Sequence, residues 1–254
     1  MSLTNLLVAI NVLVYLAELA TGGADRGSVV QRGVLYGPAV VQGGEWWRIV
    51  TGAFLHGSIL HIAFNMFALY QVGNLVEQLF GRVRYALLYA IALAGAAAAV
   101  LWFNYDQPTL GASGAIFGLF GALVAVGLRL GQRGRALIGQ VVPVVAINLV
   151  FTFAVPGISA AGHIGGLITG FVAGLLLFMI PSQQRERAYA YANAPGADPA
   201  AADRTAQYAT VTAPRATDPS EPEPGVVTIE HPPHAAPHEE AAPVAPLETR
   251  DPRE

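Results

Sequence analysis

The sequence lacks cysteine and lysine, and few of its residues are charged. The absence of cysteine excludes disulfide bridges, thiolate metal sites and a cysteine nucleophile. All fourteen basic residues are arginine, and the formal net charge of −3 offers no basic field that would attract nucleic acid. Only 12% of the residues are charged, whereas soluble domains carry about a quarter. Because most acidic residues follow Pro181, the chain before that point is poorer still in charge, which indicates a membrane protein.

Long apolar runs fill the chain up to Pro181. A helix that crosses a bilayer needs about 20 mostly apolar residues, and six runs approach that length. They are Leu3–Thr21, His56–Leu79, Tyr85–Phe103, Ser113–Leu128, Ala136–Val155 and Ala160–Ile180. The pattern predicts an all-α membrane protein with six transmembrane helices, of which the fourth is the shortest and richest in glycine. A soluble all-helical core is the alternative, but six successive runs with almost no amphipathic period argue against it.

The arginines predict how the spans are oriented. Seven flank the spans on one side, and three lie in the long loop on the other side. The seven are Arg82, Arg84, Arg129, Arg133, Arg135, Arg185 and Arg187, and the three are Arg26, Arg32 and Arg48. By the positive-inside rule we expect both termini in the cytoplasm. No positive segment precedes the first run, so we expect a retained span there rather than a cleaved signal peptide.

The long loop between the first two spans, residues 22–55, contains the pair Trp46 and Trp47. Tryptophan favours the headgroup level of a bilayer, so we expect this loop to be partly embedded at the outer interface. An ordinary external loop is the alternative.

The composition changes after Pro181. Residues 190–254 are rich in proline, alanine, aspartate and glutamate and contain few bulky apolar side chains. Such a segment cannot bury enough surface to offset the entropy of ordering, which predicts a disordered cytoplasmic tail. The chain is therefore divided into a membrane domain, 1–182, and a tail, 183–254. The tail histidines could bind a metal weakly, but a solvated tail is the simpler interpretation.

Strongly polar side chains inside the spans are costly unless they meet a partner or a cavity. The second run carries His56, His61 and Asn65 near its start, the fourth opens with Ser113, and the sixth carries His163. The predicted topology places all five in the outer half of the membrane. Glu77, near the inner end of the second run, is interpreted as the only clear acid inside the spans. We expect its side chain to form a structural hydrogen bond to a loop or helix.

Small residues recur every four positions in the fourth and sixth runs. Gly114 and Gly118 do so in the fourth, and Gly162, Gly166, Gly170 and Gly174 do so in the sixth. Such stripes let helix backbones approach closely. If these two helices pack through their glycines, Ser113 and His163 can meet. A packing stripe without chemistry is the alternative.

These side chains would suffice for acyl transfer. A serine hydroxyl becomes a nucleophile when a base takes its proton, and histidine suits that task near neutral pH. His61 and Asn65 are four residues apart, so they share one helix face and could donate to an oxyanion together with the Ser113 backbone N–H. We find no aspartate placed to orient His163, which indicates a dyad rather than a triad. Each residue taken alone also has an ordinary structural interpretation, and only their co-location favours catalysis.

Four motifs in this order resemble the rhomboid family of intramembrane serine proteases, over residues 1–180. They are Trp47-Arg48, His56-x4-His61-x3-Asn65, Gly111-Ala112-Ser113-Gly114 and His163-x2-Gly166-x3-Gly170. The resemblance implies a six-helix bundle around a short central fourth helix, with Ser113 as nucleophile and His163 as general base.

The resemblance also implies roles for the neighbouring residues. His61, Asn65 and the Ser113 N–H would line an oxyanion hole, Arg48 would help to hold an embedded first loop, and Glu77 would be structural. Many members carry tyrosine four residues after the serine, where this chain has Phe117, whose ring can stack beneath the histidine but cannot donate a hydrogen bond. No metal or cofactor is expected. The expected partners are single-span membrane protein substrates and the lipid bilayer, and the composition suits a bacterial inner membrane.

Three rival functions compete with the protease. One is a rhomboid-like protein that binds membrane clients without cutting them. The presence of both Ser113 and His163 argues against this function. Another is a transporter or proton relay that uses the span histidines, which would favour more acids within the spans. A third is a soluble hydrolase with Gly-x-Ser-x-Gly, a pattern that the residues around Ser113 do not match. The sequence does not predict the oligomeric state.

Overall fold

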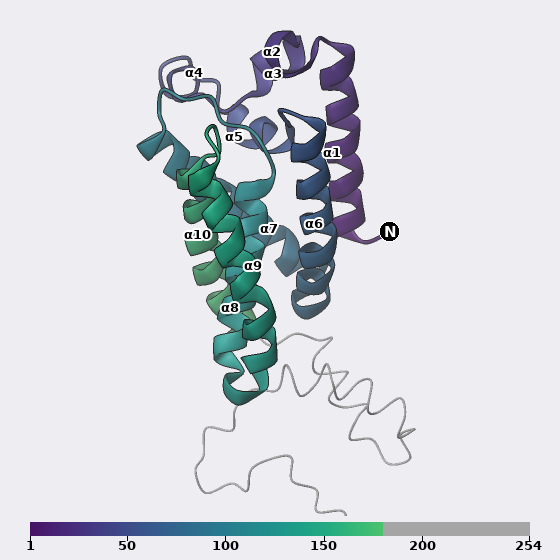
Figure 1. Cartoon of the computed structure of the whole chain (residues 1–254), viewed down its shortest axis with the longest axis vertical. Helices are drawn as coiled ribbons and strands as arrows, with labels where there is room; N and C mark the ends of the chain where they lie inside the picture. Colours follow the sequence, from purple (N-terminus) through teal and green to yellow (C-terminus); the bar gives the residue numbers. More distant parts are fainter. Residues whose placement is uncertain (180–254) are drawn as a thin grey trace, which may run out of the picture. The chain divides into compact units, whose positions relative to one another are not determined.

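The computed structural model describes residues 1–179, without the side chains of Asp25 and Met179. Six long helices occur in this part of the chain (Figure 1), in the order predicted from the apolar runs. They are α1 (Leu3–Ala20), α6 (Ile59–Phe80), α7 (Arg82–Phe103), α8 (Ser113–Arg129), α9 (Arg135–Ala154) and α10 (Ala160–Met179). Five of the apolar helices are long enough to cross a membrane, and α8 is shorter, with 17 residues. The chain is a multi-pass integral membrane protein, and its described part is a bundle of helices. The predicted tail and the boundary at residue 182 lie outside the described residues.

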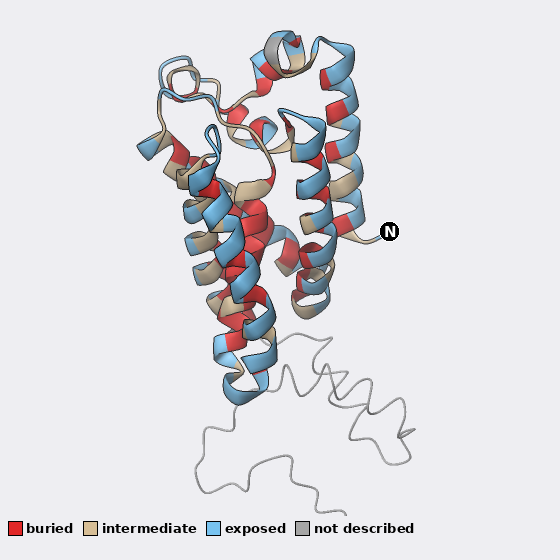
Figure 2. Cartoon of the chain, in the orientation of Figure 1, coloured by how far each residue is buried: buried red, intermediate tan, exposed pale blue. Residues whose placement is uncertain are grey.

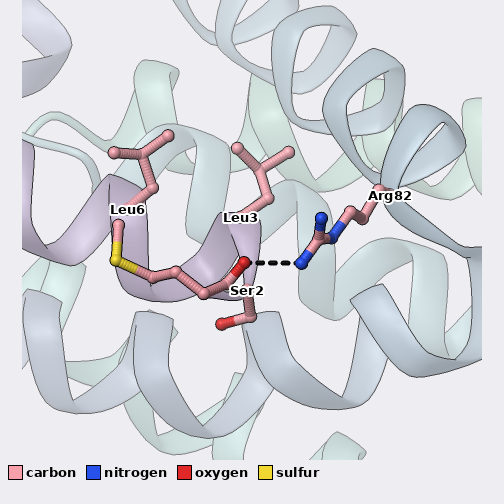
Figure 3. A pocket seen from close by; sticks show the side chains of 5 residues that line it. Ser2, Leu3, Leu6 and Arg82 are labelled. Atoms are coloured by element: carbon pink, nitrogen blue, oxygen red, sulfur yellow. Dashed lines mark hydrogen bonds between the residues drawn. The ribbon is translucent and has the colours of Figure 1, made fainter.

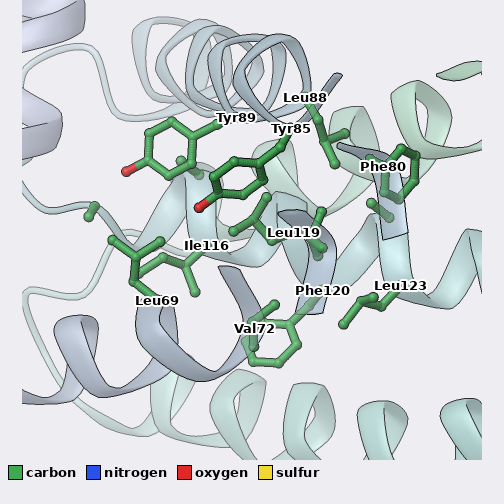
Figure 4. Close-up of a cluster of buried hydrophobic side chains, with 14 of the residues drawn as sticks. Leu69, Val72, Phe80, Tyr85, Leu88, Tyr89, Ile116, Leu119, Phe120 and Leu123 are labelled. Atoms are coloured by element: carbon green, nitrogen blue, oxygen red, sulfur yellow. The ribbon is translucent and has the colours of Figure 1, made fainter. Parts of the chain in front are cut away.

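Helix α8 is surrounded by the other helices. It contacts α6, α7, α9 and α10, and twelve of its residues are buried (Figure 2). Figure 4 shows its side chains Ile116, Leu119 and Leu123 packed among Leu69 of α6 and Tyr85 of α7. A helix that is apolar on all sides must be covered by protein or by lipid, and α8 is covered mainly by protein. The packing therefore holds the first residue of α8, Ser113, inside the bundle.

Glycines bring α8 and α10 into backbone contact. A Cβ atom on Gly166 would lie 1.9 Å from the carbonyl oxygen of Gly114, and one on Gly170 would lie 2.1 Å from the carbonyl oxygen of Gly118. One turn further on, a Cβ on Gly174 would lie 2.7 Å from the Cα of Ala122. The close packing predicted from the glycine stripes is confirmed. We call this contact the glycine seam.

The loop between α1 and α6 contains short helices: α2 (Gly23–Arg26), α3 (Ser28–Gly33), α4 (Gly37–Val41), α5 (Arg48–Thr51) and the 3-10 turn η1 (Gly52–Phe54). A second 3-10 turn, η2 (Gly131–Gly134), precedes α9.

Arg48 organises this loop from within. Its side chain is buried, its Nη1 donates to the carbonyl oxygens of Gln31 and Val34 at 2.9 Å each, and its Nε pairs with Glu45. Trp47 is more than half exposed. The embedding of the loop in the bilayer stays a prediction.

The same loop is tied to the segment that precedes α8. Leu35 and Thr109 form an antiparallel bridge, with N–H to oxygen distances of 3.1 and 2.8 Å. The N–H of Gly111 donates to the carbonyl of Gly52 at 2.9 Å. These bonds fix the backbone two residues before Ser113, so the first loop supports the start of α8.

Glu77 joins the end of α6 to the beginning of α1. Its carboxylate accepts hydrogen bonds from the backbone N–H groups of Leu3 and Thr4 at 2.9 Å and from the Thr4 hydroxyl at 2.8 Å. Arg82 Nε lies 3.5 Å from the same carboxylate, and its guanidinium also donates to the carbonyl of Met1 beside a small cavity (Figure 3). The carboxylate caps the positive end of α1, and it lies about 24 Å along α6 from His61. Glu77 therefore joins α6 to α1, remote from Ser113.

Candidate active site

The structure brings Ser113 and His163 together. Ser113 opens α8, and His163 lies in the first turn of α10. The Ser113 Oγ and the His163 Nε2 are 2.7 Å apart, a hydrogen-bonding distance. Because the glycine seam begins at Gly114, next to Ser113, and at Gly166, about one turn after His163, backbone contact sets the separation of the two residues. The predicted meeting of the fourth and sixth spans at these two residues is confirmed.

An aromatic ring supports the imidazole from one side. Phe117, one turn after Ser113 and buried, stacks on His163 with the ring centroids 4.2 Å apart and the planes 14° from parallel. Offset stacking of this kind holds the plane of the ring. Phe117 supplies the stacking surface without a hydroxyl.

A third residue contacts His163 from α9. The Thr152 Oγ1 lies 2.7 Å from the His163 Nδ1, and it also lies 2.7 Å from the carbonyl oxygen of Asn148, one turn earlier. The Thr152 side chain is 4% exposed. Sequence reasoning sought an aspartate as the partner of His163 and missed this residue. A single threonine in an apolar helix gives no signal by which it could have been found.

His61 and Gly111 border the serine on the α6 side. The Nδ1 of His61 accepts a hydrogen bond from the N–H of Gly57 at 3.4 Å. A Cβ on Gly111 would lie 2.8 Å from the His61 Nε2 and 3.7 Å from the Ser113 Oγ. Gly111 also has φ +122°, which disfavours other residues. A glycine at this position therefore leaves space between the imidazole of His61 and the serine.

Asn65 lies one turn after His61 and is buried. Its side-chain amide donates to the carbonyl oxygen of His61 at 3.0 Å. The two predicted oxyanion donors thus occupy one face of α6, linked by this bond.

His56 precedes α6 rather than lying within it, because Ser58 caps the helix and accepts from the N–H of His61. The side chain of His56 is 1% exposed, and its ring meets that of His61 edge-on at 5.1 Å. Burial, assisted by the nearby His61, lowers the pKa of His56 to about 4, although a hydrogen bond to the Phe54 carbonyl opposes the shift. The ring is therefore neutral near pH 7.

The interpretation of Glu77 as the only clear acid inside the spans is wrong. Glu18 of α1 is fully buried, and its two carboxylate oxygens accept the N–H of His56 at 3.1 and 3.2 Å. The bond ties α1 to the segment that leads into α6. Glu18 already lies within the first predicted run, Leu3–Thr21, and only its partner, a backbone N–H, could not be found from the sequence.

Among residues 1–179, no group of three or more histidine, aspartate or glutamate side chains lies close enough to hold a metal ion.

Comparison with known proteins shows the family of this chain. The family model for the Rhomboid domain matches residues 43–180, more than half of the chain. The chain belongs to the rhomboid family. It is 41% identical over 177 residues to Rhomboid protease GluP of Bacillus subtilis (strain 168), a match that covers 68% of this chain and 34% of that protein.

Two further relatives of this rhomboid chain come from a plant and from a bacterium. It is 35% identical over 162 residues to RHOMBOID-like protein 6, mitochondrial, of Arabidopsis thaliana, covering 63% of this chain and 52% of the relative. It is 32% identical over 151 residues to YdcA of Bacillus subtilis, covering 59% of this chain and 74% of the relative. The chain thus spans about a third of the length of GluP and about half of the plant protein.

Proposed function

We propose that this rhomboid-family chain is an intramembrane serine endopeptidase that hydrolyses peptide bonds of single-span membrane proteins in or near their transmembrane segments. The observation that carries the proposal is the 2.7 Å contact between the Ser113 Oγ and the His163 Nε2. At this distance an imidazole can take the serine proton directly. The similarity to GluP, which is named a rhomboid protease, supports the same activity.

The reaction proceeds in two halves. The Ser113 Oγ attacks the substrate carbonyl carbon while its proton passes to the His163 Nε2. The tetrahedral intermediate then collapses, the C–N bond breaks, and His163 returns the proton to the leaving amine. Water next attacks the acyl ester and loses a proton to His163, the C–O bond to Ser113 breaks, and the serine recovers its proton. No metal or cofactor takes part.

The negative oxygen of the intermediate would be held by His61, Asn65 and the backbone N–H of Ser113. Because the Nδ1 of His61 accepts from Gly57, a neutral ring carries its hydrogen on Nε2, the nitrogen beside Gly111. The Asn65 amide carries two hydrogens, so it can donate one to His61 and the other to the substrate. The Ser113 N–H lies in the first turn of α8, where backbone N–H groups have no partner within the helix. These donors could surround one oxygen in a site of low dielectric, where they stabilise charge most strongly.

Substrate choice follows from the chemistry of a membrane site. A substrate helix hides its carbonyls in its own hydrogen bonds, so the cleaved stretch must unwind, which favours helix-destabilising residues and a small residue at the cut. The proposed setting is a bacterial inner membrane, with a membrane domain of residues 1–182, a cytoplasmic tail of 183–254 and both termini in the cytoplasm. The excess of arginine in the alternate loops supports this orientation.

Replacing the nucleophile tests the proposal. The full chain in detergent micelles should cleave a fluorescently labelled single-span substrate, and Ser113→Ala should lower the rate at least about 1,000-fold. Thr169→Val serves as the control because it also removes one hydroxyl, and that hydroxyl donates to the Gly165 carbonyl within α10. A Ser113→Ala variant that cleaves as fast as the parent would exclude Ser113 as the nucleophile.

The rival function is a client-binding protein without hydrolysis. The same preparation distinguishes the two, because a fluorophosphonate labels a serine that is activated by a base. Labelling of Ser113 that disappears in His163→Asn supports the protease. Folded chain that retains the substrate, fails to cleave it and fails to label supports the binder.

A further inference from the structure

His163 is held through both of its ring nitrogens, and the second contact comes from a different helix from the first. Its Nε2 faces Ser113 on α8, and its Nδ1 faces the hydroxyl of Thr152 on α9. The Thr152 hydroxyl lies equally close, at 2.7 Å, to the backbone carbonyl of Asn148. The four groups form a chain that runs from α8 through α10 to the backbone of α9.

Counting hydrogens along this chain fixes the direction of every bond. A backbone carbonyl can only accept, so the single hydrogen of the Thr152 hydroxyl is donated to Asn148. The same hydroxyl must then accept from the His163 Nδ1–H. A neutral imidazole carries one ring hydrogen, which leaves a lone pair on Nε2 toward Ser113. This arrangement satisfies all three contacts, whereas the other tautomer would set two acceptors 2.7 Å apart.

We propose that Thr152 is a positioning residue that holds His163 in the tautomer required of a general base. The inference rests on the proposed function and extends it by adding a third member to the serine–histidine pair. A base whose hydrogen sits on Nε2 cannot take the serine proton, so the tautomer decides whether the pair is competent. Thr152 also accepts from the imidazolium that forms during the reaction, so the bond persists throughout the cycle.

A hydroxyl suits this place better than a carboxylate. In water-soluble serine proteases a buried aspartate orients the histidine. Within a membrane bundle an unpaired carboxylate is expensive to bury, while a hydroxyl bonded to a carbonyl of its own helix is satisfied at little cost. Phe117 and Thr152 divide the task, since the stacked ring holds the plane of the imidazole and the hydroxyl prevents its rotation within that plane.

The test compares Thr152→Val, which keeps the shape and removes the hydroxyl, with Thr152→Ser, which keeps the hydroxyl. With the full chain and a labelled single-span substrate, Thr152→Val should lower kcat about 10- to 100-fold while KM stays within about twofold. Thr152→Ser should restore kcat to within about threefold of the parent. Thr169→Val is the matched control and should retain the parent kcat, since its hydroxyl donates within α10.

A spectroscopic measurement separates this inference from the proposed function. In nitrogen-15 NMR spectra of histidine-labelled full chain, the His163 signals are assigned by their loss in His163→Asn. The parent should show hydrogen on Nδ1, and Thr152→Val should shift part of the population to Nε2. A parent with hydrogen on Nε2, or Thr152→Val with the parent kcat, overturns the role of Thr152. Failure of the parent to cleave and to label with a fluorophosphonate overturns the protease instead, whatever the tautomer.

Discussion

Helices α8 and α9 both border His163, but they are held in opposite ways. Helix α8 is buried along most of its length and meets α10 through glycine backbones. Helix α9 buries only Val141, Val145 and Thr152 among its 20 residues, and Figure 2 shows most of its surface exposed. Ser113, the proposed nucleophile, therefore begins the helix with the most buried residues among the six long helices of residues 1–179. Thr152, proposed to orient the base, lies on the helix with the fewest.

The difference indicates which of the two separations, serine to histidine or histidine to threonine, is fixed by backbone packing. The serine–histidine separation is set by backbone contact in the glycine seam, where no side chain can rotate to absorb a change. The histidine–threonine separation depends on one polar contact and a few apolar side chains. Disturbing the seam should thus harm folding and activity together, while disturbing α9 should mainly harm activity.

The largest expected effect comes from adding one methyl group to the seam. Gly170→Ala would place a Cβ 2.1 Å from the Gly118 carbonyl oxygen, so the helices must separate. We expect a loss of about 3 kcal/mol or more in stability, together with loss of cleavage. The measurement is the thermal unfolding midpoint in detergent micelles.

Gly139→Ala supplies the control on α9. A Cβ at Gly139 meets nothing within 4 Å. The same added methyl should therefore change the free energy of unfolding by no more than about 1 kcal/mol and leave the cleavage rate close to that of the parent. Equal effects at the two glycines would break the contrast between α8 and α9.

Acidification should have an intermediate effect on stability. The group expected to respond is His56, which lies in neither α8 nor α9, so this test sharpens the comparison of the two helices. His56 has a folded-state pKa of about 4 against an ordinary value of 6.5, because burial disfavours the charged ring. The contribution of neutral His56 to the free energy of unfolding is fully present above pH 6.5. It declines as the pH falls toward 4, because the unfolded chain binds the proton more readily than the folded chain. The loss would reach at most about 3 kcal/mol.

The measurement is the unfolding midpoint between pH 8 and pH 4, for the parent and for His56→Asn. The parent should lose more stability than the variant across this range. Parallel curves would show that other groups cause the sensitivity to acid.

The smallest expected effect concerns the stacked ring contributed by α8. Phe117→Leu keeps an apolar side chain but removes the flat face beneath His163, so kcat should fall about tenfold with a small change in stability. Phe117→Tyr keeps the face and should stay within about threefold of the parent. A Phe117→Leu variant with the parent kcat would leave Thr152 and the seam as sufficient supports for the imidazole.

Most of the fold was predictable because the bilayer imposes a strong rule on sequence. Runs of apolar residues predicted the six helices in order, and the glycine stripes of α8 and α10 predicted the contact between them. The starts of helices were less accurate. Helix α6 begins at Ile59 instead of His56 because Ser58 caps it, and α7 begins at Arg82 instead of Tyr85 since a charged residue can occupy a helix end at the interface.

Parts of the site that depend on register between helices were not predictable. Ser113 and His163 stood out because polar groups are rare in spans, and the motifs around them were distinctive. Thr152 did not, because a threonine bonded to the carbonyl four residues earlier is ordinary in a membrane helix. Its contact with His163 arises only from the rotation of α9 about its own axis. The partner of Glu18 was not predictable for a similar reason, since it is a backbone N–H in a segment far along the chain.

The place of Thr152 on α9 has a consequence for the lipids around the protein. Ile147, Val150 and Phe153 of this helix are exposed, and helices whose length does not match the hydrocarbon thickness tilt at a cost of fractions of a kcal/mol per Å. A tilt of α9 would stretch the bond between Thr152 and His163, while Ser113 and His163 stay in register. On the proposed mechanism, acyl-chain length would then act on the turnover rate in the manner of an effector, with no lipid entering the catalytic pocket.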